Sequence, residues 1–481
     1  MRYMTSLKEG AQFDVQRLFY MATTRSIIDY SAPILTQLSD QQFTRLEVLQ
    51  NNALRLMLGA PMWTRLCNLQ HEGNLPPLRT RIEIRNIHIA TKAIMSERPS
   101  ATKAKIKEDL TKHPIARTTN TYTTSIGNII RKHKMLDTLT KLKEDSIHNE
   151  YHPAPWQLQI AKFNYTSLPG SKRNCTIAEM RTAAFKAISD AEAENSYTLY
   201  TDGTVDPETE TSGAAVTSAN FSACWRTSNN ASTMQTELVA IKQALEYTKD
   251  NENGSVVIHC DSKSAMQALQ KTQIKENKHL ITSIHVLIQK HHNQNRHITL
   301  NWIPSHIGIP GNEEADRLAK QTNRMERVQI TLQPSLQQIK NNTKTIYRET
   351  LKANVKQWVE HNSRSAIWYH KTTDLIPPPI DKHTHREIAV TIHRLRLGYR
   401  ANWEIIDNIE RPCNHCNEDT RKPLIHYLNK CEHTRNMRQN ITTPNDEDTE
   451  EAFNAACKIA KNITQNFEMY TDTLLNYKPP R

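Results

Sequence analysis

The stretch YTLYTDGT, residues 197–204, places an aspartate in the middle of a predicted strand. Tyr, Thr and Leu are residues that pleated sheets accept well, whereas Asp is among those that strands disfavour. Gly203 then ends the run. A carboxylate in a buried strand is unfavourable unless it has a partner. Asp202 therefore directs attention to the other carboxylates of the chain.

The residues after this stretch predict a sheet with helices. Strand-like runs recur as SGAAVTS, FSACWRT, SVVIHC and HITLNW, and helical stretches separate the later ones. Three antiparallel-looking strands followed by helix, strand, helix, strand and helix are typical of an α/β or α+β layer. We therefore expect one such domain at residues 195–325.

Two further carboxylates lie where they can approach Asp202. Glu237 lies in TMQTELVAIKQALEYT, an amphipathic helix whose apolar face it borders. Taken alone, a rim glutamate turned toward water is the simpler interpretation. Asp261 ends the apolar run SVVIHCD, and the carboxyl ends of buried strands are where open α/β sheets place functional groups. Asp261 would serve equally well as the N-cap of the next helix.

The fourth carboxylate, Asp316, lies in IPGNEEADRLAKQT, where Gly311 and Asn312 predict a turn and an N-cap. Acids in a first helical turn also complement the helix dipole, which Glu313 and Glu314 would do equally well. The four carboxylates together are more informative, because like charges held close together repel unless cations neutralise them. Clusters with oxygen ligands alone suit Mg²⁺ or Mn²⁺. Two such ions can activate a water and stabilise the leaving oxygen of a phosphodiester.

The charge of the chain favours a polyanionic partner. A net charge of +12 suits nucleic acid, although it fits a basic protein without such a partner equally well. The first residues, MRYMTSLKEGAQFD, lack the apolar segment of a secretory signal, and no long apolar run predicts a membrane span. We expect an intracellular protein, cytoplasmic or nuclear, with reduced or metal-bound cysteines and no membrane partner.

Four blocks, YTDGT, TELVAIKQALEY, VIHCDSKSAMQAL and NWIPSHIGIPGNEEADRLAK, resemble the signature blocks of the type 1 ribonuclease H family in order and approximate spacing. The resemblance implies a five-stranded mixed sheet flanked by helices. It also implies an acidic tetrad that binds two Mg²⁺ ions, which Mn²⁺ can replace, and cleaves the RNA strand of RNA–DNA hybrids. By position the tetrad is Asp202, Glu237, Asp261 and Asp316. His306 in PSHIG matches the histidine of the family's mobile loop, taken to assist proton transfer or product release.

Other polar residues of this domain have two interpretations each. Asp206 is expected to be a solvated turn residue, and Ser262 is a weak candidate for a contact with the substrate backbone. The resemblance implies that a hybrid is recognised by its shape and its 2′-hydroxyls. A basic stretch could contact phosphates or form a solvated helix face; its residues are Lys271, Lys275, Lys278, Lys290 and Arg296.

The flanks carry less chemistry. Residues 1–95 are expected to be helical: FTRLEVLQNNALRLMLGAP has apolar residues at helical spacing before Gly59 and Pro61. This region resembles the segment downstream of the polymerase core in non-LTR retrotransposon reverse transcriptases. No Y-x-D-D signature occurs, so we expect no polymerase activity. Residues 96–194 are expected to be a polar connector, 326–384 a helical linker and 441–481 a polar tail.

A cysteine cluster in CNHCNEDTRKPLIHYLNKC predicts a small zinc-binding module at residues 385–440. Cys413, Cys416, His426 and Cys431 have the spacing of a closed, structural zinc site, and His415 and His433 are alternative ligands. Reduced thiols without a metal are the competing interpretation. The cluster resembles the Cys-Cys-His-Cys motif that ends the polymerase reading frame of many non-LTR retrotransposons.

These observations lead to one expected function and one alternative. We expect an endoribonuclease that cleaves the RNA strand of hybrids with two metal ions, leaving a 5′-phosphate and a 3′-hydroxyl, as the resemblance implies. The chain would be the C-terminal part of a non-LTR retrotransposon polyprotein. The alternative is a nucleic-acid-binding remnant without catalysis, which coats hybrid or RNA.

Overall fold

The computed structural model describes residues 4–6, 9–111, 122–152, 160–172, 174–192, 196–229, 231–250, 254–271, 273–380, 383–406, 409–438 and 441–479. The expected boundaries at residues 1, 194, 195, 440 and 481 lie outside them. The chain forms two compact units. We call residues 88–113 and 134–341 the central unit, and residues 1–87, 114–133 and 342–481 the flanking unit. None of the helices in the described ranges is both long and apolar enough to cross a bilayer.

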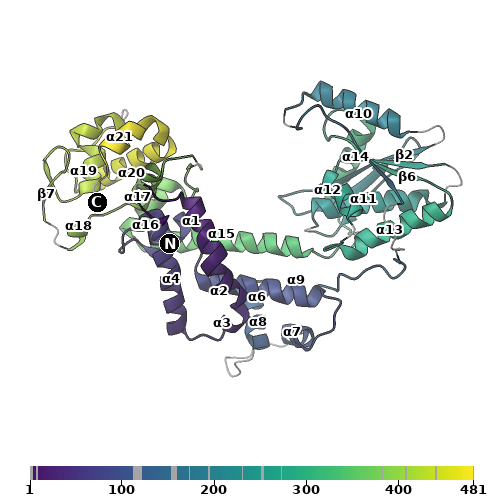
Figure 1. Ribbon diagram of the computed structural model, residues 1–481, viewed down its shortest axis with the longest axis horizontal. Helices are drawn as coiled ribbons and strands as arrows, with labels where there is room; N and C mark the ends of the chain where they lie inside the picture. The colour runs from purple at the N-terminus through teal and green to yellow at the C-terminus, as the bar shows by residue number, and fades with distance from the viewer. Residues whose placement is uncertain are drawn as a thin grey trace. The chain divides into compact units, whose positions relative to one another are not determined.

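The central unit is built on a mixed sheet with the order β1-β6-β5-β2-β3-β4 (Figure 1). Pairing is antiparallel between β2 and β3 and between β3 and β4, and parallel at the other three junctions. The strands are β1 (Lys162–Tyr165), β2 (Tyr197–Val205), β3 (Ser212–Thr217), β4 (Ser222–Thr227), β5 (Val256–Cys260) and β6 (Ile298–Trp302). The mixed sheet was predicted, but the expectation of five strands is wrong, because β1 adds a sixth.

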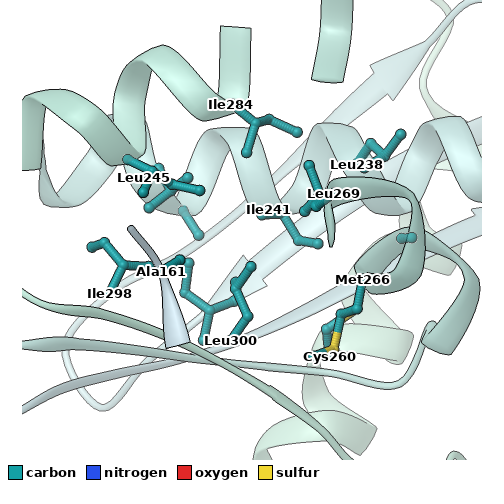
Figure 2. Close-up of a cluster of buried hydrophobic side chains, with 14 of the residues drawn as sticks. Ala161, Leu238, Ile241, Leu245, Cys260, Met266, Leu269, Ile284, Ile298 and Leu300 are labelled. Atoms are coloured by element: carbon teal, nitrogen blue, oxygen red, sulfur yellow. The ribbon is translucent and has the colours of Figure 1, made fainter. Parts of the chain in front are cut away.

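One face of the sheet is covered by α11 (Thr233–Tyr247), α12 (Lys263–Gln270) and α13 (Lys278–Asn293). Alternate strand residues such as Leu199, Ile258 and Leu300 are fully buried against these helices, as Figure 2 shows for the cluster around Leu300. Leu238, Ile241 and Leu245 of α11 are all buried, as predicted. Each such side chain contributes about 1.5–3 kcal/mol by its removal from water. This core fixes the strands that carry the site.

The opposite face is covered by α10 (Ile177–Ala191) and α14 (Pro310–Gln321). Met180, Ala184 and Ile188 of α10 pack against isoleucines that follow β6. The segment expected to be a polar connector therefore supplies a strand and a helix of the central unit, in addition to α7 (Ala101–Thr111) and α9 (Leu136–Thr140). Its capping box at Thr176 and Glu179 starts α10.

Gly203 does not end β2, in contrast to the prediction. The strand continues to Val205, and Gly203 pairs with Ala214 of β3. A Cβ atom at position 203 would lie 2.6 Å from the Oγ1 atom of Thr236 in α11. Glycine is therefore required here because α11 crosses β2 at very short range, which brings the first turns of the helix next to Asp202.

The flanking unit is helical. Its elements include α1 (Phe13–Tyr20), α2 (Ser26–Tyr30), α3 (Ala32–Leu35), α4 (Asp40–Leu58), α5 (Leu66–Glu72), α8 (Tyr122–Lys132), α16 (Arg364–Thr373), α17 (Arg386–Leu397) and α18 (Asn402–Ile406). Helices α6 (Leu78–Met95) and α15 (Leu336–Glu360) have residues in both units. The predicted helix α4 ends at Gly59 with φ 63°, as expected, but Leu49 and Leu56 are exposed and the buried face instead carries Leu54 and Met57.

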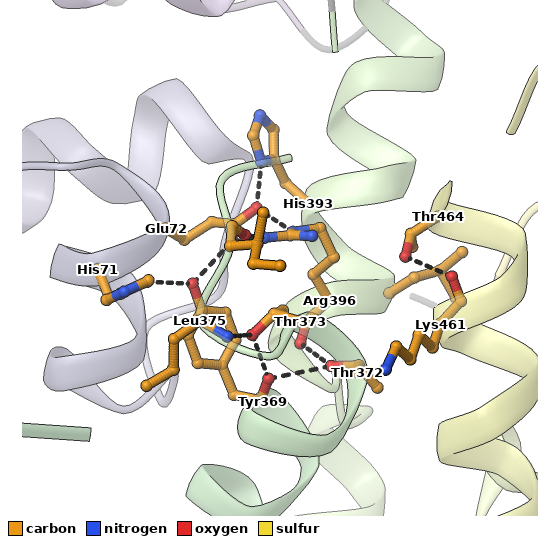
Figure 3. A network of polar contacts seen from close by, with 12 residues as sticks. His71, Glu72, Tyr369, Thr372, Thr373, Leu375, His393, Arg396, Lys461 and Thr464 are labelled. Carbon is orange, nitrogen blue, oxygen red and sulfur yellow. Dashed lines mark hydrogen bonds and ion pairs between the residues drawn. The ribbon is translucent and has the colours of Figure 1, made fainter. Parts of the chain in front are cut away.

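A buried ionic network holds α5, α16 and α17 together (Figure 3). Both carboxylate oxygens of Glu72 accept from Arg396 Nε, at 2.9 and 3.0 Å, and Tyr369 Oη and His393 Nδ1 lie 2.8 and 2.7 Å from them. Burial raises the pKa of Glu72, but Arg396 and His393 lower it overall, to about 2. Glu72 is therefore a charged, fully buried crosslink of the flanking unit.

The C-terminal residues form a second core of the flanking unit. The stretch 441–481, expected to be a polar tail, contains α20 (Glu450–Gln465) and α21 (Thr471–Asn476). Phe453, Ile459 and Ile463 of α20 are buried, and α20 packs against α19 (Pro423–Asn429). The predicted tail is thus wrong, because α20 has an apolar face that needs a partner.

Candidate active site and candidate metal centre

The register of the sheet brings Asp202 and Asp261 together. β2 and β5 run parallel with Thr201 opposite Cys260, so the next residue on each strand is an aspartate. Asp202 is still within β2, whereas Asp261 directly follows β5. Asp261 does not cap α12, because the N-cap is Ser262, whose side chain accepts from the N–H of Ala265. Asp261 is therefore free to face Asp202.

Glu237 reaches the same place from α11. The helix begins after a capping box formed by Ser232 and Gln235, and Glu237 lies where α11 crosses Gly203. Its side chain is 3% exposed, which excludes the rim glutamate in water. Ligand atoms of Asp202, Glu237 and Asp261 all lie within 4.8 Å of one another. Three of the four predicted carboxylates thus form one tight cluster.

Asp316 borders this cluster from α14 and does not belong to the tightest group. The helix starts at Pro310, so Gly311 and Asn312 lie in its first turn and are not a turn and N-cap as expected. Asp316 accepts from Lys320 Nζ at 2.6 Å. Asp316 forms a second group with His306 and Glu313, whose ligand atoms also lie within 4.8 Å of one another.

The cluster has an unfavourable surplus of negative charge. Burial, together with Asp261 and Asp316, raises the pKa of Asp202 to about 7, and Lys320 opposes this rise. Burial and the same neighbouring carboxylates raise the pKa of Glu237 well above its usual value. Burial also raises the pKa of Asp261, although a hydrogen bond from Asn312 and the charges of His306 and Lys172 lower it. The arrangement therefore favours a bound proton or a bound cation.

An open pocket of about 480 Å³ lies over the carboxylates. His306 lines it from the loop after β6, exposed and with a left-handed backbone (φ 57°). The structure therefore brings all five predicted residues to one pocket. Its lining is Asp202, Gly203, Thr204, Val205, Thr233, Glu237, Asp261, Ser262, Lys263, Ser264, Ser305, His306, Asp316 and Lys320.

The donor set of this pocket fits a hard divalent cation. Oxygen ligands lie about 2.1 Å from Mg²⁺, so those of one ion are up to about 4.2 Å apart. The separations of at most 4.8 Å among Asp202, Glu237 and Asp261 are close to that range. No thiolate or second histidine lies among these ligand atoms in the part of the chain that the structure describes, which disfavours zinc.

Three neighbours of the carboxylates were not predicted from the sequence. Asn312 is buried and hydrogen-bonds to Asp261, and it was taken for an N-cap. Lys320 pairs with Asp316 from one turn later, a spacing of i, i+4 that the sequence displays. Lys263 lines the pocket, with its ammonium 5.3 Å from the ring centroid of Trp302. Lys263 follows Asp261 closely, but no sequence pattern singled it out.

The other polar residues behave as follows. Asp206 accepts from the N–H of Glu208 in a turn, as expected, and Ser262 lines the pocket. Of the five basic residues in the stretch 271–296, three have partners. Lys278 pairs with Glu97, Lys290 with Glu150, and Arg296 donates to the carbonyls of Thr248 and Lys249. For Lys271 and Lys275 no partner is found among the described residues, so only these two are unencumbered for phosphate contacts.

The cysteine cluster of the flanking unit forms a second candidate centre. Cys413 and Cys416 lie in the turn between β7 (Arg411–Pro412) and β8 (Asp419–Thr420), His426 lies in α19, and Cys431 follows it. The Sγ atoms of Cys413 and Cys431 are 4.0 Å apart, and Cys416 Sγ is 3.1 Å from His426 Nε2. Ligand atoms around a tetrahedral Zn²⁺ lie about 3.5–3.8 Å apart. These four residues therefore fit a closed zinc site.

The same geometry discriminates between the candidate histidines. His415 donates to or accepts at the carbonyl of Lys478 through Nε2, at 2.8 Å, which requires it to donate, and His433 stacks on Tyr477. Only His426 joins the thiols among the described residues. Its Nδ1 lies 2.9 Å from Glu447 Oε1, and Thr420 Oγ1 donates to the other oxygen of Glu447 at 2.7 Å. A carboxylate in this position fixes the tautomer that leaves Nε2 free for a metal.

Comparison with known protein families agrees with this geometry. The family model described as RNase H matches residues 194–324. The matched residues run from the start of β2 to the end of α14 and include all four carboxylates and His306, whereas β1 and α10 precede them. Residues 194–324, with their mixed sheet, flanking helices and acidic pocket, form an RNase H domain.

Proposed function

We propose that the protein cleaves the RNA strand of RNA–DNA hybrids by hydrolysis that depends on two Mg²⁺ ions. The observation that carries this proposal is the convergence of Asp202, Glu237 and Asp261 within 4.8 Å, beneath a pocket that Asp316 and His306 also line. The raised pKa values of the buried carboxylates support it, since such a cluster gains most from bound cations.

Each group has a proposed role. Asp202 and Asp261 would hold both ions, with Glu237 and Asp316 on either side. Bound Mg²⁺ would supply activation of the attacking water and stabilisation of the leaving oxygen. His306 is exposed at the rim, where its imidazole can take up a proton and release it to solvent. Lys263 and Lys320 place positive charge at the pocket, where a phosphate of the substrate would lie.

An end-labelled RNA–DNA hybrid tests the proposal against the binding-only alternative. With Mg²⁺, the wild-type chain is expected to shorten the RNA strand and Asp261→Asn to lose this activity by several orders of magnitude. Asp206→Asn is the matched control, since Asp206 lies outside the pocket, and it is expected to cleave normally. If both wild type and Asp261→Asn only retard the hybrid on a gel, the binding module is correct. Equal cleavage by both would refute the metal-site assignment.

We propose that Cys413, Cys416, His426 and Cys431 bind one structural Zn²⁺. The thiol and imidazole donors of this site, buried around His426 and Cys431, support it. Burial and the neighbouring thiols raise the pKa of Cys431 to about 12, so the thiolates that zinc requires need the cation itself. Native mass spectrometry is expected to show one zinc per chain, and a zinc-free chain with unchanged folding would contradict the proposal.

We also propose an origin in a non-LTR retrotransposon. It rests on the resemblance of the stretch around α4 and of the cysteine cluster to segments of such polyproteins. Genomic DNA upstream of the coding region is expected to encode a polymerase core with a Y-x-D-D motif in the same reading frame. Copies that consistently lack it would count against this origin.

A further inference from the structure

Two elements that precede the RNase H match are built onto the sheet edge next to the pocket. β1 pairs with β6 along its whole length, from Lys162 opposite Thr299 to Tyr165 opposite Trp302. Thr166 then donates to the carbonyl of Trp302 twice, through its N–H at 3.2 Å and its Oγ1 at 2.6 Å. β6 is the strand from which residues 303–309 emerge, and we call these residues the His306 loop.

Apolar contacts anchor the His306 loop on α10. Ile303, Ile307 and Ile309 are 0–2% exposed and share one cluster with Met180, Ala184 and Ile188 of α10. His306 lies between these buried residues and is itself exposed. The loop is thus held by its isoleucines while its histidine faces the pocket.

Polar contacts hold the residues on both sides of His306. Arg181 Nε in α10 donates to the carbonyl of Ile307 at 2.6 Å. Lys172, in the segment before α10, donates through Nζ to Ser305 Oγ at 2.7 Å. Gly308 has φ 77°, and a side chain there would overlap the guanidinium of Arg181. The two neighbours of His306 in the chain are therefore both tied to residues outside the RNase H match.

We propose that β1, residues 166–176 and α10 belong to the catalytic domain and position His306, with Arg181 and Lys172 as positioning residues. The inference rests on the proposed role of His306 in hybrid cleavage. A left-handed backbone is uncommon for histidine and persists when surrounding contacts hold it. Such support matters because a displacement of about 1 Å in a reacting group can reduce a rate by about 100-fold. The functional domain then begins near residue 160 and not at 194.

Substitution of Arg181 in the full chain tests this inference. Arg181→Met keeps an apolar stem but removes the donor to Ile307, and Lys186→Met, on an exposed position of the same helix, is the control. Arg181→Met is expected to lower kcat on a hybrid about tenfold because the histidine loses its position. KM should change by less than about twofold, since no substrate contact is removed. Arg181→Lys, which retains a donor, is expected to recover most of the loss.

A double-mutant cycle separates positioning from general destabilisation. If Arg181 acts through His306, Arg181→Met should have no further effect on kcat in a His306→Ala chain. Equal losses in both backgrounds, or an effect no larger than that of Lys186→Met, would overturn the inference.

Hydrogen exchange of the loop distinguishes failure of the inference from failure of the proposed function. Amides of the His306 loop are expected to exchange faster in Arg181→Met than in Lys186→Met, whether or not the protein cleaves hybrids. Faster exchange in a chain that cleaves nothing would refute the proposed function and leave the anchoring intact. Unchanged exchange in an active chain would refute the anchoring alone.

Discussion

Replacing Asp202 with asparagine is expected to stabilise the central unit in metal-free buffer at pH 8 and to abolish hybrid cleavage. Burial and the neighbouring carboxylates raise the pKa of Asp202 from 3.8 to about 7. Between these two values the native state binds a proton that the unfolded state has lost, so stability falls as the pH rises through this window. Above pH 7 the whole penalty is present.

The size of the effect follows from the shift. A rise of about 3 pKa units corresponds to about 4 kcal/mol at pH 8, at 1.36 kcal/mol per unit. At pH 5 the native carboxyl is protonated and the penalty is only about 2 kcal/mol. The 6% exposure of Asp202 leaves little solvent to screen the charge. Asn keeps the shape of the side chain and removes its charge.

Hydrogen exchange followed by mass spectrometry measures the difference. Slowly exchanging peptides of β2 and β5 in Asp202→Asn are expected to be protected up to about a thousandfold more than in wild type at pH 8, with EDTA present. This advantage should shrink by more than tenfold at pH 5. Added Mg²⁺ should protect wild type but not the variant.

The neighbouring carboxylate provides the control for this experiment. The N–H of Glu208 lowers the pKa of Asp206, so Asp206→Asn should not stabilise the unit at pH 8. If Asp202→Asn is no better protected than wild type at pH 8, the account of a charge-strained cluster is wrong.

Three further changes test other parts of the structure. Gly203→Ala should destabilise the central unit by about 1–3 kcal/mol, measured by denaturant unfolding, because the added methyl group meets α11. An unfolding midpoint equal to that of wild type would show that α11 can move away. Glu72→Gln should destabilise the flanking unit by about 3–5 kcal/mol, since it leaves Arg396 as a buried unpaired charge. Exchange of α5 and α17 amides measures this, and the exposed Glu349→Gln should have no effect. Glu447→Gln should weaken zinc binding about 10–100-fold in competition with a chelating dye, whereas Glu451→Gln should not.

Much of the site could be predicted because its residues lie at the ends of strongly patterned elements. β5 is an apolar run, α11 has a clear apolar face, and both carry their carboxylate at a position that the pattern fixes. The parallel register of β2 and β5 then brings Asp202 and Asp261 together. The pattern therefore contained the convergence, although not the precise grouping that separates Asp316 from the other three.

Other features were missed for identifiable reasons. β1 has only four residues, KFNY, without alternation, and its partner β6 is remote in the sequence, so local patterns could not reveal it. Gly203 was interpreted as a strand break because its role, the close approach of α11, is a tertiary contact. The tail was a misinterpretation of a readable signal, since α20 displays apolar residues at helical spacing.

The most direct test of the central claim is single-turnover cleavage of one labelled RNA presented in two forms, paired with DNA and single-stranded, with Mg²⁺ and the full chain. The RNA should be cut only in the hybrid, with 5′-phosphate and 3′-hydroxyl ends, and only when Asp202 is present. Intact hybrid that remains bound to the wild-type chain, or equal cutting of the single strand, would contradict the assignment of this pocket as a hybrid ribonuclease site.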